Sequence, residues 1–337
     1  MQKTWQKLII SALLCGGLIS PQLGQANTAQ RQDVKNFIDR LADKHDFKRD
    51  DLTKMFGQVE IKSEIIDAMN RPYEGKPWHQ YRPIFVTQAR IDEGAKFLGE
   101  NLQILKQAQQ KYGVPAEVIT AILGVETRYG RYRGKYRVVD ALATLGFDYP
   151  RRSKFFLKEL EAFLLLSREE GFDPLAISSS YAGAMGKPQF MPSSYRMYAI
   201  DFDGDGVRDL LDNSADAIGS IANYLSRHGW QRDHPIAIQT NATPQAPQKM
   251  GKLKKPSKPI QHWQDKGYQP AETTAGQLKA DLIVLENKQG PEYWFGLQNF
   301  YAITRYNHSE LYAMAVFQLS QGIKTHYQAG QSQAHAE

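Results

Sequence analysis

The residue with the clearest capacity for chemistry is Glu126, an acid within a segment that is otherwise apolar. Residues 114–130 read VPAEVITAILGVETRYG, with Pro115 suited to a first helical turn and Gly130 to a helix end, so they predict a buried helix. On helical spacing Glu126 follows Ile122 by one turn and shares its apolar face. Because apolar surroundings disfavour a charged carboxylate, we expect a raised pKa for Glu126 and the role of a general acid near neutral pH.

Patterns typical of other catalytic classes do not occur in the sequence. There is no G-x-S-x-G nucleophile motif, no H-E-x-x-H or C-x-x-C metal motif and no glycine-rich phosphate loop, and Cys15 is the only cysteine. Carboxylate chemistry is what remains. The alternative for Glu126 is a structural role, either paired with Arg128 or Arg131 or solvated at the helix end.

A second motif, DFDGDGVRDLLD at residues 201–212, has the spacing of an EF-hand calcium loop. Acids stand at loop positions 1, 3, 5, 9 and 12, and glycine stands at position 6. The last acid is an aspartate rather than the usual glutamate, position 8 is Arg208, and no second hand follows. We therefore expect one structural Ca²⁺ that supports the fold, held by Asp201, Asp203, Asp205, the carbonyl of Val207, and Asp212.

Two further stretches carry groups that suit a sugar-binding cleft. Residues 178–195, SSSYAGAMGKPQFMPSSY, combine small residues that allow close backbone approach with the polar side chains of Ser180 and Gln189. Residues 299–306, NFYAITRY, are rich in aromatic and amide groups and precede Asn307. A packed loop and a core aromatic cluster are the structural alternatives for these two stretches.

The N-terminus predicts export. Lys3 and Lys7 precede an apolar run, and Gly24-Gln25-Ala26 supplies the small residues that a signal peptidase needs. We expect a mature periplasmic protein that begins at Asn27, with lipidation of Cys15 as the less favoured alternative and with it a peripheral or lipid-anchored membrane association. The formal net charge of +6 includes those two lysines and favours anionic partners, among which nucleic acid is excluded by export.

The remainder is too long for one small core and divides by composition. Helical periodicity dominates, except for a proline-rich region with short β-prone runs. We expect a mainly α, α+β fold with these segments: a signal peptide at 1–26, an α domain at 27–100, a catalytic core at 101–230, a small β-rich domain at 231–297, a C-terminal part of the core at 298–327, and a disordered tail at 328–337.

Several motifs in a fixed order resemble the membrane-bound lytic murein transglycosylase B family. They are GVETRYG around Glu126, YPRR at 149–152, AGAMGKPQFMPSSY at 182–195, the DFDGDG loop, DAIGSIANYL at 216–225 and NFYAITRYNHS at 299–309. The resemblance implies a lysozyme-like core that contains the EF-hand-like loop. It also implies a catalytic acid/base at Glu126 and sugar contacts from Ser180, Gln189, Asn307, Tyr312, Tyr81, Arg151 and Arg152.

The implied activity is cleavage of the β-1,4 bond between N-acetylmuramic acid and N-acetylglucosamine in peptidoglycan, leaving 1,6-anhydromuramic acid ends. Many glycosidases need two carboxylates about 5 to 9.5 Å apart, for which Asp140 and Asp148 are the weaker partners of Glu126. A lysozyme-type hydrolase and a non-catalytic, calcium-stabilised peptidoglycan-binding protein are the rival hypotheses. Lys187-Pro188 departs from the aromatic-glycine pair that is common in the family.

Overall fold

A computed structural model describes residues 27–71, 75–243, 253–272 and 276–334. The expected signal peptide, Cys15 included, lies outside the described residues. Within the described residues, no helix is long and apolar enough to cross a membrane.

The chain begins with a series of helices whose buried faces follow the helical period. On α1, for example, Val34, Phe37, Ile38 and Leu41 are buried and the intervening positions are mostly exposed. The hydroxyl of Thr87 caps α5 by accepting from the amide of Arg90. The elements of this part are η1 Thr28–Gln30, α1 Gln32–His45, α2 Arg49–Phe56, α3 Ser63–Met69, α4 Trp78–Phe85, α5 Gln88–Glu100 and α6 Leu102–Tyr112.

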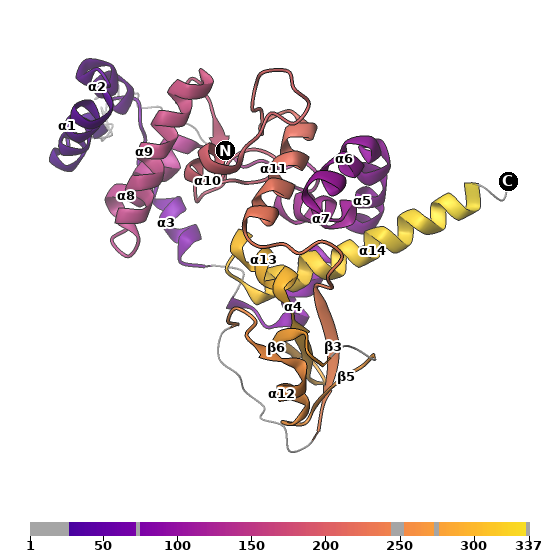
Figure 1. The fold of residues 1–337 in the computed structure, drawn as a ribbon. Helices are drawn as coiled ribbons and strands as arrows, with labels where there is room; N and C mark the ends of the chain where they lie inside the picture. The colour runs from indigo at the N-terminus through magenta and orange to yellow at the C-terminus, as the bar shows by residue number, and fades with distance from the viewer. Residues whose placement is uncertain (1–26, 72–74, 244–252, 273–275, 335–337) are drawn as a thin grey trace, which may run out of the picture.

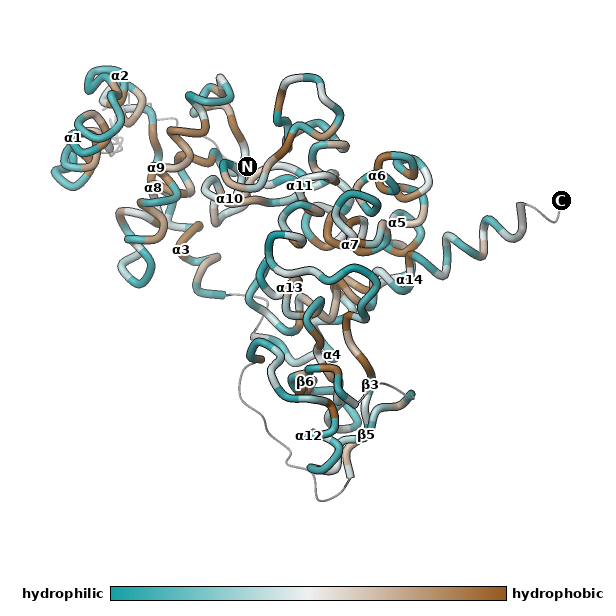
Figure 2. The backbone as a smooth tube through the Cα atoms, viewed as in Figure 1, coloured by the Kyte–Doolittle hydropathy of each residue, from teal (hydrophilic) through white to brown (hydrophobic). Residues whose placement is uncertain are grey.

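The centre of the molecule is α7, Ala116–Thr127, which is buried over most of its length and largely brown in Figure 2. It packs against α5, α6, α11 and α14, so a helix that is apolar on nearly every face has a protein neighbour on each side. The other helices of this region are α8 Val138–Asp148, α9 Ser153–Glu170, α10 Pro192–Tyr198, α11 Ser214–Arg227, α13 Gln298–Tyr306 and α14 Glu310–Ala334. A two-residue antiparallel pair joins β1 Tyr136–Arg137 to β2 Ser178–Ser179.

A five-stranded antiparallel sheet projects below this helical body in Figure 1. Its strands are β3 Ala237–Ala242, β4 Lys258–Pro259, β5 Tyr268–Pro270, β6 Lys279–Asn287 and β7 Gly290–Gly296, in the order β4-β6-β7-β3-β5, with α12 Ile260–Gln264 beside them. Trp263, Tyr268 and Phe295 belong to a small hydrophobic cluster that is separate from the main core. The mainly helical fold with small sheets confirms the expected fold class.

The C-terminal end differs from the expectation of a disordered tail at 328–337. Helix α14 continues to Ala334 and extends away from the body in Figure 1. Residues 328–332 are exposed, so packing does not order them. Their helix is explained by propagation, because each residue added to an existing helix gains a backbone hydrogen bond without a new nucleation cost. The last three residues of the expected tail lie outside the described residues.

Close packing of α7 gives a first prediction, for Gly124→Ala. A Cβ at Gly124 would lie 2.7 Å from the hydroxyl oxygen of Tyr129, whose ring is largely buried. We expect a loss of about 1–3 kcal/mol in the free energy of unfolding, the usual cost of overpacking, measured by urea denaturation. Gly330→Ala is the matched control, because nothing lies within 4 Å of its added methyl group and helix propensity should leave that variant as stable or slightly more stable. Equal stability of the two variants would contradict the packing argument.

Candidate active site

Glu126 lies half-buried in the last turn of α7 and receives a hydrogen bond from a distant tyrosine. The hydroxyl of Tyr312, which is buried on α14, donates to its Oε1 at 2.6 Å across 186 positions of sequence. The ring of Tyr306 lies nearly parallel to that of Tyr312, with centroids 6.4 Å apart. Burial raises the pKa of both phenols, and the neighbouring charge of Glu126 raises it further. Tyr312 is therefore a neutral, permanent donor to the carboxyl group.

The chain leaves α7 abruptly, two residues after the acid. Arg128, Tyr129 and Gly130 all adopt left-handed conformations, with φ of 49°, 61° and 89°. For the two residues with a Cβ this conformation costs about 1–2 kcal/mol each, so surrounding contacts must enforce it. The hydroxyl of Tyr129 donates to the carbonyl of Arg90, whose guanidinium in turn donates to the carbonyl of Gly124, each at 2.6 Å. These two hydrogen bonds, both partly buried, hold the turn in place.

The two arginines that were considered as partners for Glu126 bind the carboxylate of Glu93 instead. Arg128 donates to both oxygens of Glu93 on α5, at 2.6 and 2.7 Å, and Arg131 approaches Glu93 at 3.3 Å. These interactions lower the pKa of Glu93, chiefly through the hydrogen bond from Arg128. The ion cluster therefore anchors the strained turn to α5.

The two candidate second carboxylates are held in place by arginines. Asp140 is 1 % exposed and accepts from Arg137 at 2.7 and 2.9 Å and from the amide of Glu60 at 2.9 Å. Asp148 accepts from Arg31 at 2.6 and 3.0 Å. Through Glu60 and Arg31, both acids tie α8 to the N-terminal segment of the chain, which is a structural task.

Residues 178–195 comprise β2, an irregular loop and the start of α10, and the loop meets the ends of α7 and α13. The hydroxyl oxygen of Ser180 accepts from the amides of Ala182 and Ala184, at 3.3 and 3.2 Å. Gln189 has a left-handed backbone, with φ of 51°, and its side-chain amide donates to the carbonyl of Gly186 at 2.8 Å. These bonds fix the shape of the loop from inside.

Lys187 in this loop links two regions whose connection is not evident in the sequence. Its ammonium group donates to the carbonyl of Asp212 at 2.6 Å and to the hydroxyl of Ser214 at 2.7 Å, and its amide donates to the carbonyl of Leu210. Its own carbonyl accepts from the hydroxyl of Thr127, next to the acid, at 2.9 Å. The departure at position 187 was visible in the sequence, but this bridging role was not.

The remaining expected contact residues lie at different depths. Tyr81 is buried on α4. It lies close enough to Tyr312 to be a minor cause of the raised pKa of Tyr312. Asn307 is the first residue after α13. Arg151 and Arg152 are exposed just before α9, and Arg152 lies over the ring of Phe155 at 4.3 Å.

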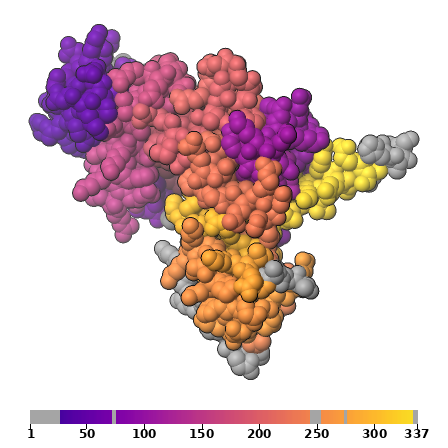
Figure 3. Space-filling model, viewed as in Figure 1, coloured from indigo at the N-terminus to yellow at the C-terminus, as the bar shows by residue number. Residues whose placement is uncertain are grey.

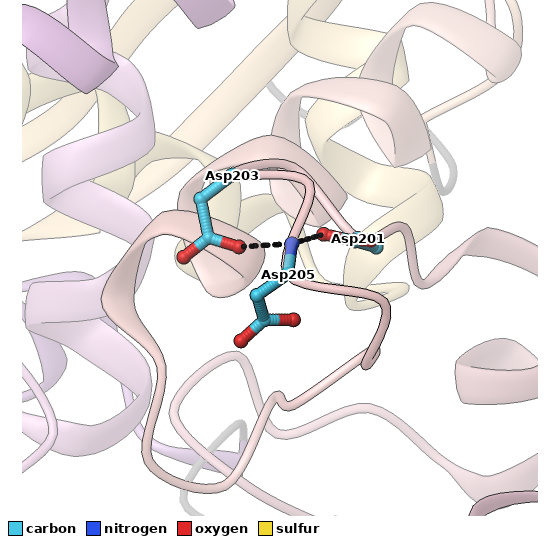
Figure 4. Close-up of side chains that lie close together, drawn as sticks. All are labelled: Asp201, Asp203 and Asp205. Carbon is cyan, nitrogen blue, oxygen red and sulfur yellow. Dashed lines mark hydrogen bonds between the residues drawn. The ribbon is translucent and has the colours of Figure 1, made fainter.

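The aspartates at 201, 203 and 205 converge as the loop motif predicts. Figure 4 shows the three carboxylates around one turn, and one oxygen from each lies within 4.8 Å of the others. Asp201 accepts from the amides of Gly204, Asp205 and Gly206, and these backbone hydrogen bonds, Gly206 first, lower its pKa. Three convergent carboxylates in an oxygen-rich loop fit the ligand preference of Ca²⁺.

Asp212, the last acid of the expected calcium set, lies outside this cluster. Its carboxylate forms an ion pair with Arg133. Sequence reasoning missed Asp216, a fully buried acid of α11 whose two oxygens accept from the amides of Phe202 and Asp209 at 2.7 Å. Asp216 therefore holds the loop backbone from the protein side. Its position four residues beyond the motif is the reason the spacing rule did not include it.

Comparisons with known proteins identify the family of the chain. The family model described as "Transglycosylase SLT domain" matches residues 29–321. The chain is 43% identical over 305 residues to the membrane-bound lytic murein transglycosylase B of Escherichia coli strain K12, which covers 88% of this chain and 83% of that protein.

Two solved structures are also similar to this chain. The E. coli lytic transglycosylase Slt35 in complex with calcium has a TM-score of 0.83 and 42% identity, covering 90% of this chain and 96% of that one. SltB3 of Pseudomonas aeruginosa in complex with NAG-anhNAM-pentapeptide has a TM-score of 0.76 and 29% identity, covering 86% and 78%. The likeness to Slt35 confirms the expected lysozyme-like core. The chain therefore belongs to the Transglycosylase SLT family of lytic transglycosylases.

Proposed function

We propose that this protein is a peptidoglycan lytic transglycosylase in which Glu126 acts alone as acid and then as base. The observation that carries the proposal is the half-buried carboxyl of Glu126 with a neutral phenol donating to one of its oxygens. That hydrogen bond orients the carboxyl group for proton transfer. Membership of the family, and a relative solved with an anhydromuramic product, support the same reaction class.

In the first step the Glu126 carboxyl gives its proton to the oxygen of the β-1,4 bond as that bond breaks. The N-acetyl oxygen of the same muramic acid stabilises the positive charge that develops at C1, so no second carboxylate is required. This agrees with the positions of Asp140 and Asp148, both bound to arginines. In the second step the Glu126 carboxylate takes the proton of the C6 hydroxyl, whose oxygen bonds to C1 and closes the 1,6-anhydro ring.

The C6 hydroxyl competes with water because it belongs to the reacting sugar. A well-oriented intramolecular group acts at an effective molarity of about 10⁵ M or more, far above that of water. We propose that Ser180, Gln189, Asn307, Arg151 and Arg152 hold the glycan strand and its peptides in that orientation, and that Tyr81, which is buried, acts from behind the site. The rival hypotheses predict other outcomes. Hydrolysis by a lysozyme-type mechanism would leave reducing ends, and binding without turnover would leave no product.

We also infer that the protein works in the periplasm after export. The support is the leader-like composition of residues 1–26 together with the cell-wall substrate class of the family. A lipid anchor at Cys15 remains the alternative to a free mature chain.

For the metal, we propose that one Ca²⁺ binds the loop through Asp201, Asp203, Asp205 and the carbonyl of Val207. The convergence of the three carboxylates and the calcium complex of Slt35 support the proposal. The ion would offset the repulsion among these carboxylates and order the loop. Asp212 would have to leave Arg133 in order to take part.

The first functional prediction concerns Glu126→Gln, which keeps the shape of the side chain but cannot deliver a proton. Digestion of purified sacculi should fall by at least about 10²-fold, the lower range for a positioned acid. The matched control is Glu117→Gln in the first turn of the same helix, which removes only an ion pair with Lys324 and should digest at close to the wild-type rate. Mass spectrometry of wild-type products should show anhydro ends. Reducing ends, heavier by one water, would favour the hydrolase.

A second functional prediction concerns Tyr312→Phe, which removes the donor to Glu126 and little else. Since that hydrogen bond favours the charged carboxyl, its loss should move the alkaline limb of the pH–rate profile to higher pH and lower the maximal rate by about tenfold. Tyr306→Phe is the control, because its hydroxyl donates to the carbonyl of Pro188 instead and its removal should leave the pH profile in place. Identical pH profiles for wild type and Tyr312→Phe would refute the orienting role.

The calcium proposal predicts that the melting temperature rises with Ca²⁺ and falls with EDTA. A ligand bound only by the native state adds about 2.7 kcal/mol at a hundredfold excess over its Kd. Asp203→Asn should lose most of the Ca²⁺-dependent rise, whereas Asp212→Asn should keep it. If Asp212→Asn also loses the rise, the ion draws that residue from Arg133. No rise in the wild type would exclude the site.

A further inference from the structure

A cationic groove is lined by residues of α1, α9 and α10. Helices α1 and α9 lie on the side of the molecule away from α14 (Figures 1 and 3). The groove has a volume of about 580 Å³. Five basic side chains line it, against one carboxylate from Glu161: Arg40, Lys44, Lys154, Lys158 and Arg196.

Two of the five cations have no ion-pair partner among the described residues. Glu161 already binds Lys44 and lies 3.7 Å from Arg40, while Arg196 is paired with Glu169. Among the described residues, neither Lys154 nor Lys158 forms an ion pair, and both are exposed.

The spacing of these two lysines carries an energetic cost. They stand four residues apart on α9 and therefore face the same side, where like charges destabilise a helix. A bound anion would remove this repulsion, because it would interact favourably with both ammonium groups. The two lysines could therefore bind one anionic group of the size of a phosphate.

The floor of the groove is apolar. Leu157, Ala162 and Leu165 line it, and the last two are buried. A basic rim above an apolar floor suits an amphiphile better than a free inorganic anion. The groove volume also falls within the range of about 300–1,000 Å³ that is typical of small-molecule sites.

We propose that this groove binds the headgroup of an anionic phospholipid, with its phosphate between Lys154 and Lys158 and its glycerol region over Leu157 and Leu165. Five basic side chains against one carboxylate complement the negative charge of such a headgroup. The site would hold the enzyme at a bilayer surface independently of any covalent lipid. This proposal does not depend on the catalytic role of Glu126.

The experiment measures co-sedimentation of mature protein, residues 27–337, with vesicles of phosphatidylglycerol and phosphatidylcholine in equal parts. We expect binding to these vesicles, little binding to pure phosphatidylcholine, and a loss of about 30-fold in Lys154→Gln/Lys158→Gln, given the contribution of each lysine near an anionic surface. Lys96→Gln/Lys106→Gln is the matched control, with the same change in net charge at exposed positions of α5 and α6, and should bind as the wild type does.

Circular dichroism and digestion of soluble glycan fragments should be unchanged in both double variants, which separates loss of membrane binding from loss of fold or activity. Three results would overturn the proposal: no binding of the wild type to phosphatidylglycerol vesicles, equal loss in both double variants, or undiminished binding in Lys154→Gln/Lys158→Gln. Binding of soluble polyglutamate that depends on Lys154 and Lys158, without binding to vesicles, would assign the groove to an acidic protein instead.

Discussion

The hydrogen bond from Tyr312 to Glu126 is the contact on which the arrangement of this site depends. It joins α7 to α14 across 186 positions of sequence, and Tyr312 is buried, so a misplaced tyrosine would leave its own hydroxyl unsatisfied. The dense packing of α14 on α5 and α7 keeps the tyrosine in place. The same packing that stabilises the fold therefore orients the proposed acid.

The sharp end of α7 is the second constraint. Left-handed Arg128 and Tyr129 are unfavourable by themselves, and the conformation persists because one side chain binds Glu93 and the other donates to the carbonyl of Arg90. Helix α5 supplies both partners, so the helix before the core acts as a clamp on the turn that follows the acid. A carboxyl group in the last turn of a rigid helix can be buried on one side and open on the other.

Sequence patterns predicted those features that depend on residues close together in the chain. The helix around Glu126 followed from its apolar run, although it begins after Pro115 and ends at Thr127 rather than at Gly130. The convergence of Asp201, Asp203 and Asp205 followed from loop spacing. Tertiary pairings were beyond such reasoning: nothing near Arg128 in the sequence indicates Glu93, and nothing near Asp212 indicates Arg133. The helical continuation of α14 past residue 327 was missed because composition alone suggested disorder, whereas propagation from a packed helix prevailed.

Lys187 has a consequence for how such enzymes can be altered. Its half-buried ammonium group donates hydrogen bonds to the carbonyl of Asp212 and the hydroxyl of Ser214, at the end of the aspartate loop. Its own carbonyl accepts a hydrogen bond from the hydroxyl of Thr127, the residue after Glu126. A loop transplanted from a relative with an uncharged residue at this position would leave the partners at 212 and 214 without their donor. Exchange of loops between family members must therefore transfer positions 187 and 214 as a set, and homologous recombination with a breakpoint between them would produce mismatched chimaeras.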